Sequence, residues 1–240
     1  MLKRGKVNND FREGAKAGVP IVIGYVPIAM AFGILSKTTG ISMLDSFLFS
    51  LMVFAGASQF MALNLLAIGA GMGEIILTTL LVNLRHFLMS ASLAARMKGN
   101  IKRWIPLIAF GVTDESFSVL SFKEGDITKD FTLGLQLTAY LSWVVGTVLG
   151  YLAGGLLPQI VSDGMGIALY AMFVAILVPE LKKSNKVVIL VLLSGATNTL
   201  LNYFEILPKG WNMILTIILV SSVGAYLYGE DYKEEVNVCE

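Results

Sequence analysis

Residues 74–122 read EIILTTLLVNLRHFLMSASLAARMKGNIKRWIPLIAFGVTDESFSVLSF, and two polar clusters interrupt the apolar runs of this stretch. The first cluster is Asn83-Leu84-Arg85-His86 and the second is Thr113-Asp114-Glu115-Ser116. Each has apolar residues on both sides, whereas most other long apolar runs of the chain carry no charge. The two clusters therefore need a physical explanation.

An ionised side chain near the centre of a bilayer costs roughly 2.5–3.5 kcal/mol on insertion scales. A chain tolerates this cost where the charges pair, line a wet cavity or carry a function. Because the two clusters have opposite signs, we expect Arg85 and His86 to meet Asp114 and Glu115. We interpret this meeting point as the polar centre of a small-solute transporter.

Composition places the whole chain in the membrane class. The chain has 240 residues, of which 55% are hydrophobic and 15% charged, with a mean hydropathy of +0.73. A soluble domain is nearer about 45–50% apolar and about 25% charged, so we predict an all-α integral membrane protein. A spanning helix needs roughly 20 apolar residues, which leaves room for a bundle of about six to eight transmembrane helices. We expect one transmembrane transport domain over 17–229, between an N-terminal segment (1–16) and an acidic C-terminal tail (230–240).

Charge and residue content exclude several function classes. The net charge of +1 gives no electrostatic case for binding nucleic acid. The one cysteine, Cys239, cannot form an internal disulfide, and the one histidine, His86, cannot build a metal site alone. The sequence also has no nucleotide-binding P-loop, so we expect no ATP use by this chain. A single histidine, no HExxH motif and no useful cysteine argue against an enzyme, and we expect no cofactor.

Two further stretches are candidate parts of a solute path. Pro20 and Pro27 lie in the first apolar run, where each removes a backbone donor, so we expect a kinked or unwound helix. Backbone groups freed there can face a solute, although a tolerated membrane kink is the alternative. The centre of the run 46–73 reads AGASQF, and its Ser58, Gln59 and Phe60 suit either close helix packing or the solute path.

Helical spacing groups the remaining polar residues. Asn83, His86 and Ser90 fall on one helix face, with Arg85 on another. Asn198 and Asn202 repeat at four residues and form either interhelical hydrogen bonds or a second wall of the path. Two neighbouring carboxyl groups in a low dielectric favour the uptake of a proton, so His86, Asp114 and Glu115 are the candidates for proton coupling.

Orientation follows the distribution of basic residues only in part. The basic N-terminal segment favours a cytoplasmic N-terminus. The basic loops 96–103 and 180–186 cannot both share that side if every apolar run crosses the membrane. We therefore expect some segments to be broken or re-entrant, with 17–36 and 164–179 as the candidates.

Gly146 and Gly150 form a GxxxG helix-packing signal in the run 131–162.

Several segments in fixed order resemble one known family. They are FREGAKAGVP at 11–20, GYVPIAMAFG at 24–33, AGASQF at 55–60, NLRHFLMS at 83–90 and TDESF at 113–117. Together they are similar to the AzlC family, the large subunit of azaleucine-resistance or branched-chain amino-acid permeases. The resemblance covers most of 10–210.

The resemblance implies a multi-pass protein of the bacterial cytoplasmic (inner) membrane that exports leucine, isoleucine and valine, with methionine as a further candidate. It also implies a small AzlD-like membrane protein as a partner. A homo-oligomer is a further expectation for this chain.

The chemistry of such a solute assigns roles to the polar residues. Arg85, or amide groups near Pro20 and Pro27, would bind the carboxylate, and Asp114 or Glu115 would bind the ammonium. Phe60, Met61 and Phe117 would contact the apolar side chain. A non-transporting scaffold or assembly subunit, an importer or channel, and a membrane-embedded enzyme stay open as alternatives.

Overall fold

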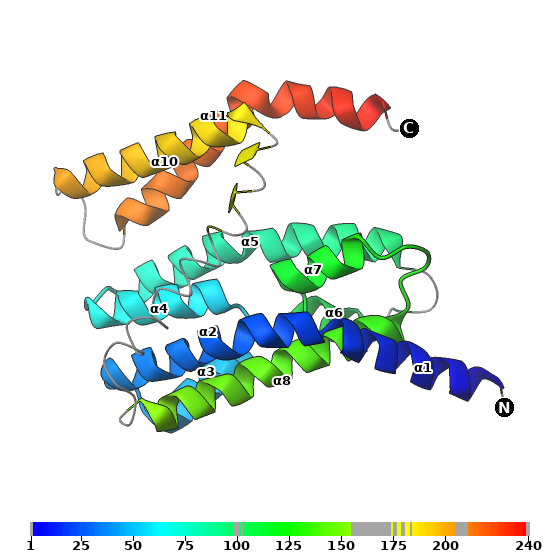
Figure 1. Cartoon of the computed structure of the whole chain (residues 1–240). Coiled ribbons are helices and arrows are strands. Elements are labelled where there is room, and N and C mark those ends of the chain that lie inside the picture. Colours follow the sequence, from blue (N-terminus) through cyan, green and yellow to red (C-terminus); the bar gives the residue numbers. More distant parts are fainter. Residues whose placement is uncertain are drawn as a thin grey trace. The chain divides into compact units, whose positions relative to one another are not determined.

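The structure is a computed structural model, and it is helical with short turns (Figure 1). It describes residues 2–97, 101, 103–154, 174, 177–178, 181–182, 184–204 and 211–238. The chain forms two compact units, the first of residues 1–63 and 82–169 and the second of 64–81 and 170–240. Each unit is described by itself below.

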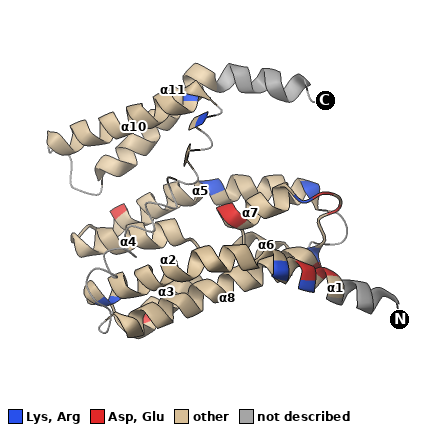
Figure 2. Ribbon diagram, viewed as in Figure 1, with Lys and Arg blue, Asp and Glu red and all other residues tan. Residues whose placement is uncertain are grey.

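Five helices of the described residues are long and apolar enough to cross a membrane. These are α2 (Val19–Thr38), α5 (Met72–Arg96), α8 (Lys129–Ala153), α10 (Asn185–Tyr203) and the first part of α11 (Trp211–Val238). The charged residues described on α2, α3, α7, α8 and α10 lie near helix ends, whereas α5 also has one, Arg85, inside its length (Figure 2). The prediction of an all-α polytopic membrane protein is confirmed.

Two apolar runs that looked like single spans are broken into half-helices. The run 46–73 forms α3 (Met43–Met52) and α4 (Gly56–Ala67), and Val53 between them has an extended backbone. The run 104–122 forms α6 (Ile105–Phe110) and α7 (Asp114–Ser121), and the extended residue there is Thr113. Broken helices are therefore present, with the extended residues Val53 and Thr113 at the two breaks.

Of the two alternatives predicted at Pro20 and Pro27, the unwound helix is wrong, because α2 is helical through both residues, and the kink stays a prediction. Pro20 lies in the first turn, where its missing N–H has no intrahelical partner to lose. Pro27 lies inside the helix, on an exposed face. The predicted re-entrant segment 164–179 lies largely outside the described residues.

Helix α8 is the centre of the first unit, with α1 (Leu2–Ala17) and α2 packed along it (Figure 1). Glycines bring the backbones into contact: a Cβ on Gly33 of α2 would lie 2.1 Å from the Thr147 carbonyl oxygen of α8. A Cβ on Gly150 of α8 would lie 2.1 Å from the Met30 carbonyl oxygen of α2. The predicted packing role of Gly146 and Gly150 is confirmed, since both face α2.

In the second unit, helices α10 and α11 pack against each other. Leu190 of α10 lies against Gly224 of α11, where an added Cβ would be 3.1 Å from the leucine. Asn212 donates through Nδ2 to Oδ1 of Asn202 at 2.9 Å. Hydrogen bonding of this kind holds membrane helices together where lipid cannot satisfy polar groups.

Candidate functional site

The two charged clusters meet in the first unit. Arg85 of α5 forms an ion pair with Asp114, the first residue of α7, with 2.9 Å between Nη1 and Oδ2. Their side chains are 36% and 26% exposed, so the pair is partly covered rather than fully buried. The predicted meeting of Arg85 with Asp114 is present, and the pairing lowers the cost of placing either charge in an apolar segment.

The carboxyl groups of Asp114 and Glu115 lie at the N-terminus of α7. Thr113 caps α7: its hydroxyl accepts from the Ser116 backbone N–H, and the Ser116 hydroxyl accepts from the Thr113 N–H. Asp114 and Glu115 therefore lie in the first turn of α7. The positive end of the helix dipole favours negative charge there, which is the local reason that two neighbouring carboxylates are tolerated.

Tyr25 of α2 connects this helix end to the core. Its side chain is buried, and its hydroxyl oxygen lies 2.9 Å from Thr113 Oγ1 and 2.5 Å from Glu115 Oε2. A phenol has one proton, so it cannot donate to both oxygens. When Glu115 is ionised it can only accept, so Tyr25 donates to Glu115 and the Thr113 hydroxyl can donate to Tyr25. A proton on Glu115 allows this order to reverse.

His86 lies beside the same break. Its Nδ1 is 2.8 Å from the Val112 carbonyl oxygen, and since a carbonyl only accepts, Nδ1 carries the proton. The opposite nitrogen, Nε2, is buried without a hydrogen-bond partner, and so is Nε of the neighbouring Arg85. One atom can accept and the other can donate, so both are available to a polar ligand or to water.

The second break, between α3 and α4, is tied to two other helices by polar side chains. Ser58 donates to Oδ1 of Asn83 on α5 at 3.0 Å. The fully buried Gln59 donates to Ser50 at 3.1 Å and accepts from the indole N–H of Trp143 at 2.8 Å. These bonds satisfy groups that hydrocarbon could not satisfy.

An aromatic contact joins the two breaks. Phe54 lies in the break before α4, and its ring centroid is 6.1 Å from that of Tyr25 in an edge-on arrangement. Tyr25 in turn reaches Thr113 in the break before α7. Phe110, the last residue of α6, lies 6.5 Å from Phe54. One buried tyrosine thus contacts both interrupted helices.

The other predicted residues lie apart from this cluster. Pro20 and Pro27 are exposed, and Phe60 is buried against Phe32 with ring centroids 5.4 Å apart. Asn198 and Asn202 belong to the second unit, where the Asn202 amide donates to the Asn198 carbonyl oxygen at 2.8 Å. The structure brings together Ser58 with Asn83, His86 with the second break, and Arg85 with Asp114.

Sequence reasoning missed Tyr25 and Trp143 as parts of the polar network. Both are aromatic residues inside uncharged apolar runs, so neither stands out by charge or by periodicity. Their hydroxyl and indole N–H groups were the available signal, because a buried tyrosine or tryptophan usually finds a hydrogen-bond partner.

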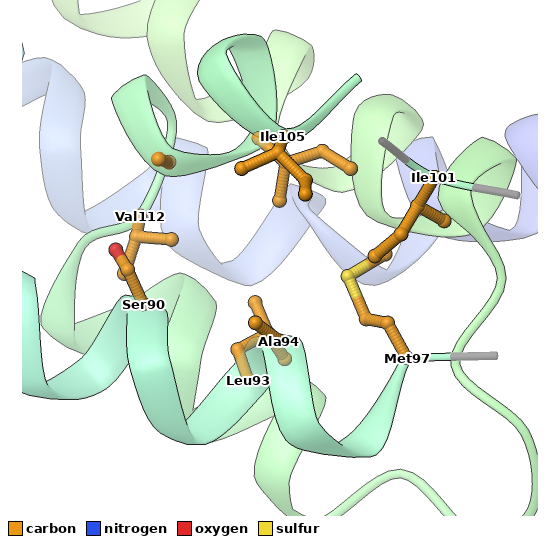
Figure 3. Close-up of a pocket in the computed structure, with 9 residues that line it drawn as sticks. Ser90, Leu93, Ala94, Met97, Ile101, Ile105 and Val112 are labelled. Carbon is orange, nitrogen blue, oxygen red and sulfur yellow. The ribbon is translucent and has the colours of Figure 1, made fainter. Parts of the chain in front are cut away.

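A small cavity lies near the cluster, between α5 and the residues around α6 (Figure 3). Its volume is about 40 Å³ and its walls are mostly apolar, with Leu93, Met97, Ile105 and Val112 among them. A space of this size suits about one water rather than an amino acid. The described residues contain no group of three or more His, Cys, Asp or Glu placed to hold a metal ion.

Comparison with known proteins finds one matching family and several related membrane proteins. A family model described as "AzlC protein" matches residues 20–157. An uncharacterized membrane protein of Archaeoglobus fulgidus is 38% identical over 72% of this chain and 76% of its own length. The inner membrane protein YgaZ of Escherichia coli is 34% identical over 78% and 79%. The branched-chain amino acid transport protein AzlC of Bacillus subtilis is 29% identical over 78% and 74%. No solved structure gives a significant match.

Proposed function

Because this chain belongs to the AzlC protein family, we propose that it is a membrane transporter that exports branched-chain amino acids from the cell. The observation that carries the proposal is the Arg85–Asp114 ion pair, held at a helix break inside a membrane-spanning unit beside Glu115. The relative from Bacillus subtilis, named as a branched-chain amino acid transport protein, supports the choice of solute.

A zwitterion fits the charges of this cluster. The Arg85 guanidinium can bind the solute carboxylate, with Nε as a donor that is still unused. Asp114 or Glu115 can bind the ammonium. In the absence of solute, Arg85 and Asp114 neutralise each other, so a bound zwitterion exchanges one charge pair for two. The site therefore keeps its charges paired in both states, which limits the cost of exposing them to an apolar environment.

Proton coupling is part of the proposal. Glu115, Tyr25 and Thr113 form a hydrogen-bonded chain whose direction depends on whether Glu115 carries a proton. Asp114 shares the same helix end, and His86 has a buried ring nitrogen that can accept a proton. Binding a proton at Glu115, Asp114 or His86 would weaken the hold on the solute ammonium, which gives a physical route to exchange.

The remaining elements of the proposal concern context. We place the transport domain at 17–229 in the bacterial inner membrane, with the N-terminal segment in the cytoplasm, as the basic N-terminus favours. The name of the Escherichia coli relative, an inner membrane protein, supports this location. A small AzlD-like membrane protein is the proposed partner. Transport rather than catalysis is the proposed role of the polar cluster.

Export from loaded cells tests the function directly. Cells that express the chain with its small partner are loaded with radiolabelled leucine, and efflux is measured with and without an imposed pH gradient. Arg85→Gln and Asp114→Asn are expected to slow efflux at unchanged protein level. Asp45→Asn, an equivalent change at an exposed helix start, is the matched control and should leave efflux unchanged.

Efflux at the wild-type rate in both site variants would show that the cluster does not bind solute. Counterflow in sealed vesicles separates the alternatives of an importer or a passive channel from coupled export. If the chain and its partner neither bind nor move leucine, a scaffold or assembly role replaces the transport proposal.

A further inference from the structure

The first unit also contains a larger hollow, distinct from the polar cluster. It is a partly open groove of about 570 Å³, within the range of small-molecule sites. Its lining residues come from α1, α3, α8, α6 and the residues that cap α6, and are mainly apolar or aromatic: Phe11, Leu51, Trp104, Leu107, Phe110, Gly111, Asp130, Leu133, Gln136, Leu137 and Tyr140. A few polar groups in a mostly apolar hollow are typical of a ligand site.

One carboxylate, that of Asp130, lines the groove, and the preceding residue Lys129 lies beside it without lining the groove. Lys129 forms an ion pair with Asp130, with 2.6 Å between Nζ and Oδ1. The Lys129 ammonium also lies 5.3 Å from the ring centroid of Trp104, which lines the groove with Asp130. Both charged side chains are partly covered, with exposed fractions of 34% and 17%. A neighbouring cation and carboxylate complement a zwitterion, whereas an anion alone would be repelled by Asp130.

Aromatic rings connect the groove with the polar cluster. Phe110 and Tyr140 line the groove, and their ring centroids are 5.7 Å apart. Both contact Phe54, at 6.5 and 5.3 Å, and Phe54 contacts Tyr25. Tyr25 then reaches Glu115. These four rings form a continuous series of contacts from the groove to the polar cluster.

The chain itself also connects the two places. Gly111 lines the groove and begins the break that ends at Thr113, the cap of α7. A side chain at Gly111 would collide with Gln136, where an added Cβ would lie 2.7 Å from Oε1. The Gln136 oxygen is buried without a partner, and its amide donates to the Ile108 carbonyl oxygen at 3.0 Å. A buried acceptor without a partner beside the groove is a further group that a ligand ammonium can use once the break moves.

We infer that this groove is a second solute site, a vestibule that binds a zwitterionic amino acid with an apolar side chain and is joined to the polar cluster by the aromatic contacts. Lys129 and Asp130 bind the charged end, and the leucine and aromatic side chains contact the apolar end. The inference rests on the proposed function, because it takes the same solute. It adds a separate place for that solute, with residues that the Arg85–Asp114 cluster does not include.

Cysteine protection tests the site, because the chain has a single native cysteine, Cys239. In a Cys239→Ser background, Leu137→Cys places a thiol in the groove, and Leu149→Cys places one on the same helix outside it. The two leucines are matched in exposure, at 46% and 48%. Labelling by a maleimide is measured on the purified chain with its small partner, with increasing leucine.

At about ten times the leucine Kd, roughly one site in eleven is empty, so labelling of Leu137→Cys should slow about tenfold. Labelling of Leu149→Cys should not change. The additional change Lys129→Gln with Asp130→Asn should remove the protection while the protein stays folded by size-exclusion chromatography. If Leu137→Cys fails to fold, Leu107→Cys, also in the groove and 52% exposed, replaces it.

Leucine counterflow of each cysteine variant in sealed vesicles separates this inference from the proposed function. Counterflow without protection at either groove position would overturn the vestibule and leave the transporter intact. Protection by phosphatidylglycerol vesicles but not by leucine would overturn it in favour of a lipid site. Absence of leucine counterflow in the wild-type chain with its partner would overturn both.

Discussion

Replacement of Gly33 by alanine should destabilise the first unit, whereas the same replacement of Gly24 on the same helix should not. A Cβ on Gly33 would lie 2.1 Å from the Thr147 carbonyl oxygen and 2.6 Å from the Tyr151 backbone nitrogen. Ordinary contact begins near 3.4 Å, so α2 and α8 must separate by about 1.3 Å. Gly24 has nothing within 4 Å of the added Cβ.

The size of the effect follows from these distances. Both clashing atoms on α8 belong to the backbone, so no side chain can rotate away, and overpacking of this kind typically costs about 1–3 kcal/mol. Alanine otherwise favours a helix over glycine by up to about 1 kcal/mol. Gly33→Ala should therefore lose about 1–3 kcal/mol, and Gly24→Ala should be neutral or slightly stabilising. Gly150→Ala tests the same interface from α8, because its Cβ would lie 2.1 Å from the Met30 carbonyl oxygen.

Thermal melting in detergent, followed by fluorescence size-exclusion chromatography of a tagged chain, measures this difference. With about 2–4 °C for each kcal/mol in a chain of this length, Gly33→Ala should melt roughly 2–12 °C below the wild type. A Gly33→Ala melting curve that overlays the wild type, or an equal loss in Gly24→Ala, would refute the backbone contact between α2 and α8.

Tyr25→Phe should slow leucine efflux roughly tenfold or more, because its hydrogen bond to the charged Glu115 contributes about 1.5–3 kcal/mol. Tyr151→Phe, which removes a hydrogen bond to the Ile41 carbonyl oxygen, is the control. Equal efflux in the two variants would contradict the role of Tyr25. Gln59→Leu should lower the melting temperature, because it leaves the Trp143 indole N–H without its acceptor at a cost of about 1–3 kcal/mol; an unchanged melting temperature would contradict this. Asn212→Leu should lower the stability of the α10–α11 pair by about 0.6 kcal/mol, which is typical of a hydrogen bond between membrane helices. A larger fall in melting temperature than that of Gln59→Leu would contradict this value.

Much of the fold could be predicted from apolar length and charge. A bundle of transmembrane helices could be predicted because a membrane helix needs an uninterrupted apolar stretch, and α5, α8 and α10 are such stretches. The ion pair could be predicted as well, since opposite charges inside apolar runs are stable only when they meet. The assignment of solute roles to individual residues stays a prediction.

The positions of the helix breaks could not be predicted, and the reason is physical. Proline is the strongest local signal for a break, yet α2 is helical through Pro20 and Pro27 because tertiary packing along α8 stabilises it. The breaks occur instead at Val53 and Thr113, which are not strong helix breakers by themselves. Polar partners on other helices satisfy the groups around each break, and those partners are distant in sequence.

The charges and the breaks in the first unit have one common cause. Asp114 and Glu115 are near the middle of an apolar run in the sequence, but in the structure they begin a half-helix, where the helix dipole favours negative charge. The break therefore lowers the cost of the carboxylates, and the carboxylates in turn supply Arg85 and Tyr25 with partners. Tyr25 also contacts Phe54 in the other break, so a movement of either half-helix changes the surroundings of Glu115. The proposed proton coupling predicts that a change in the charge of Glu115 acts on both breaks through the contacts of Tyr25.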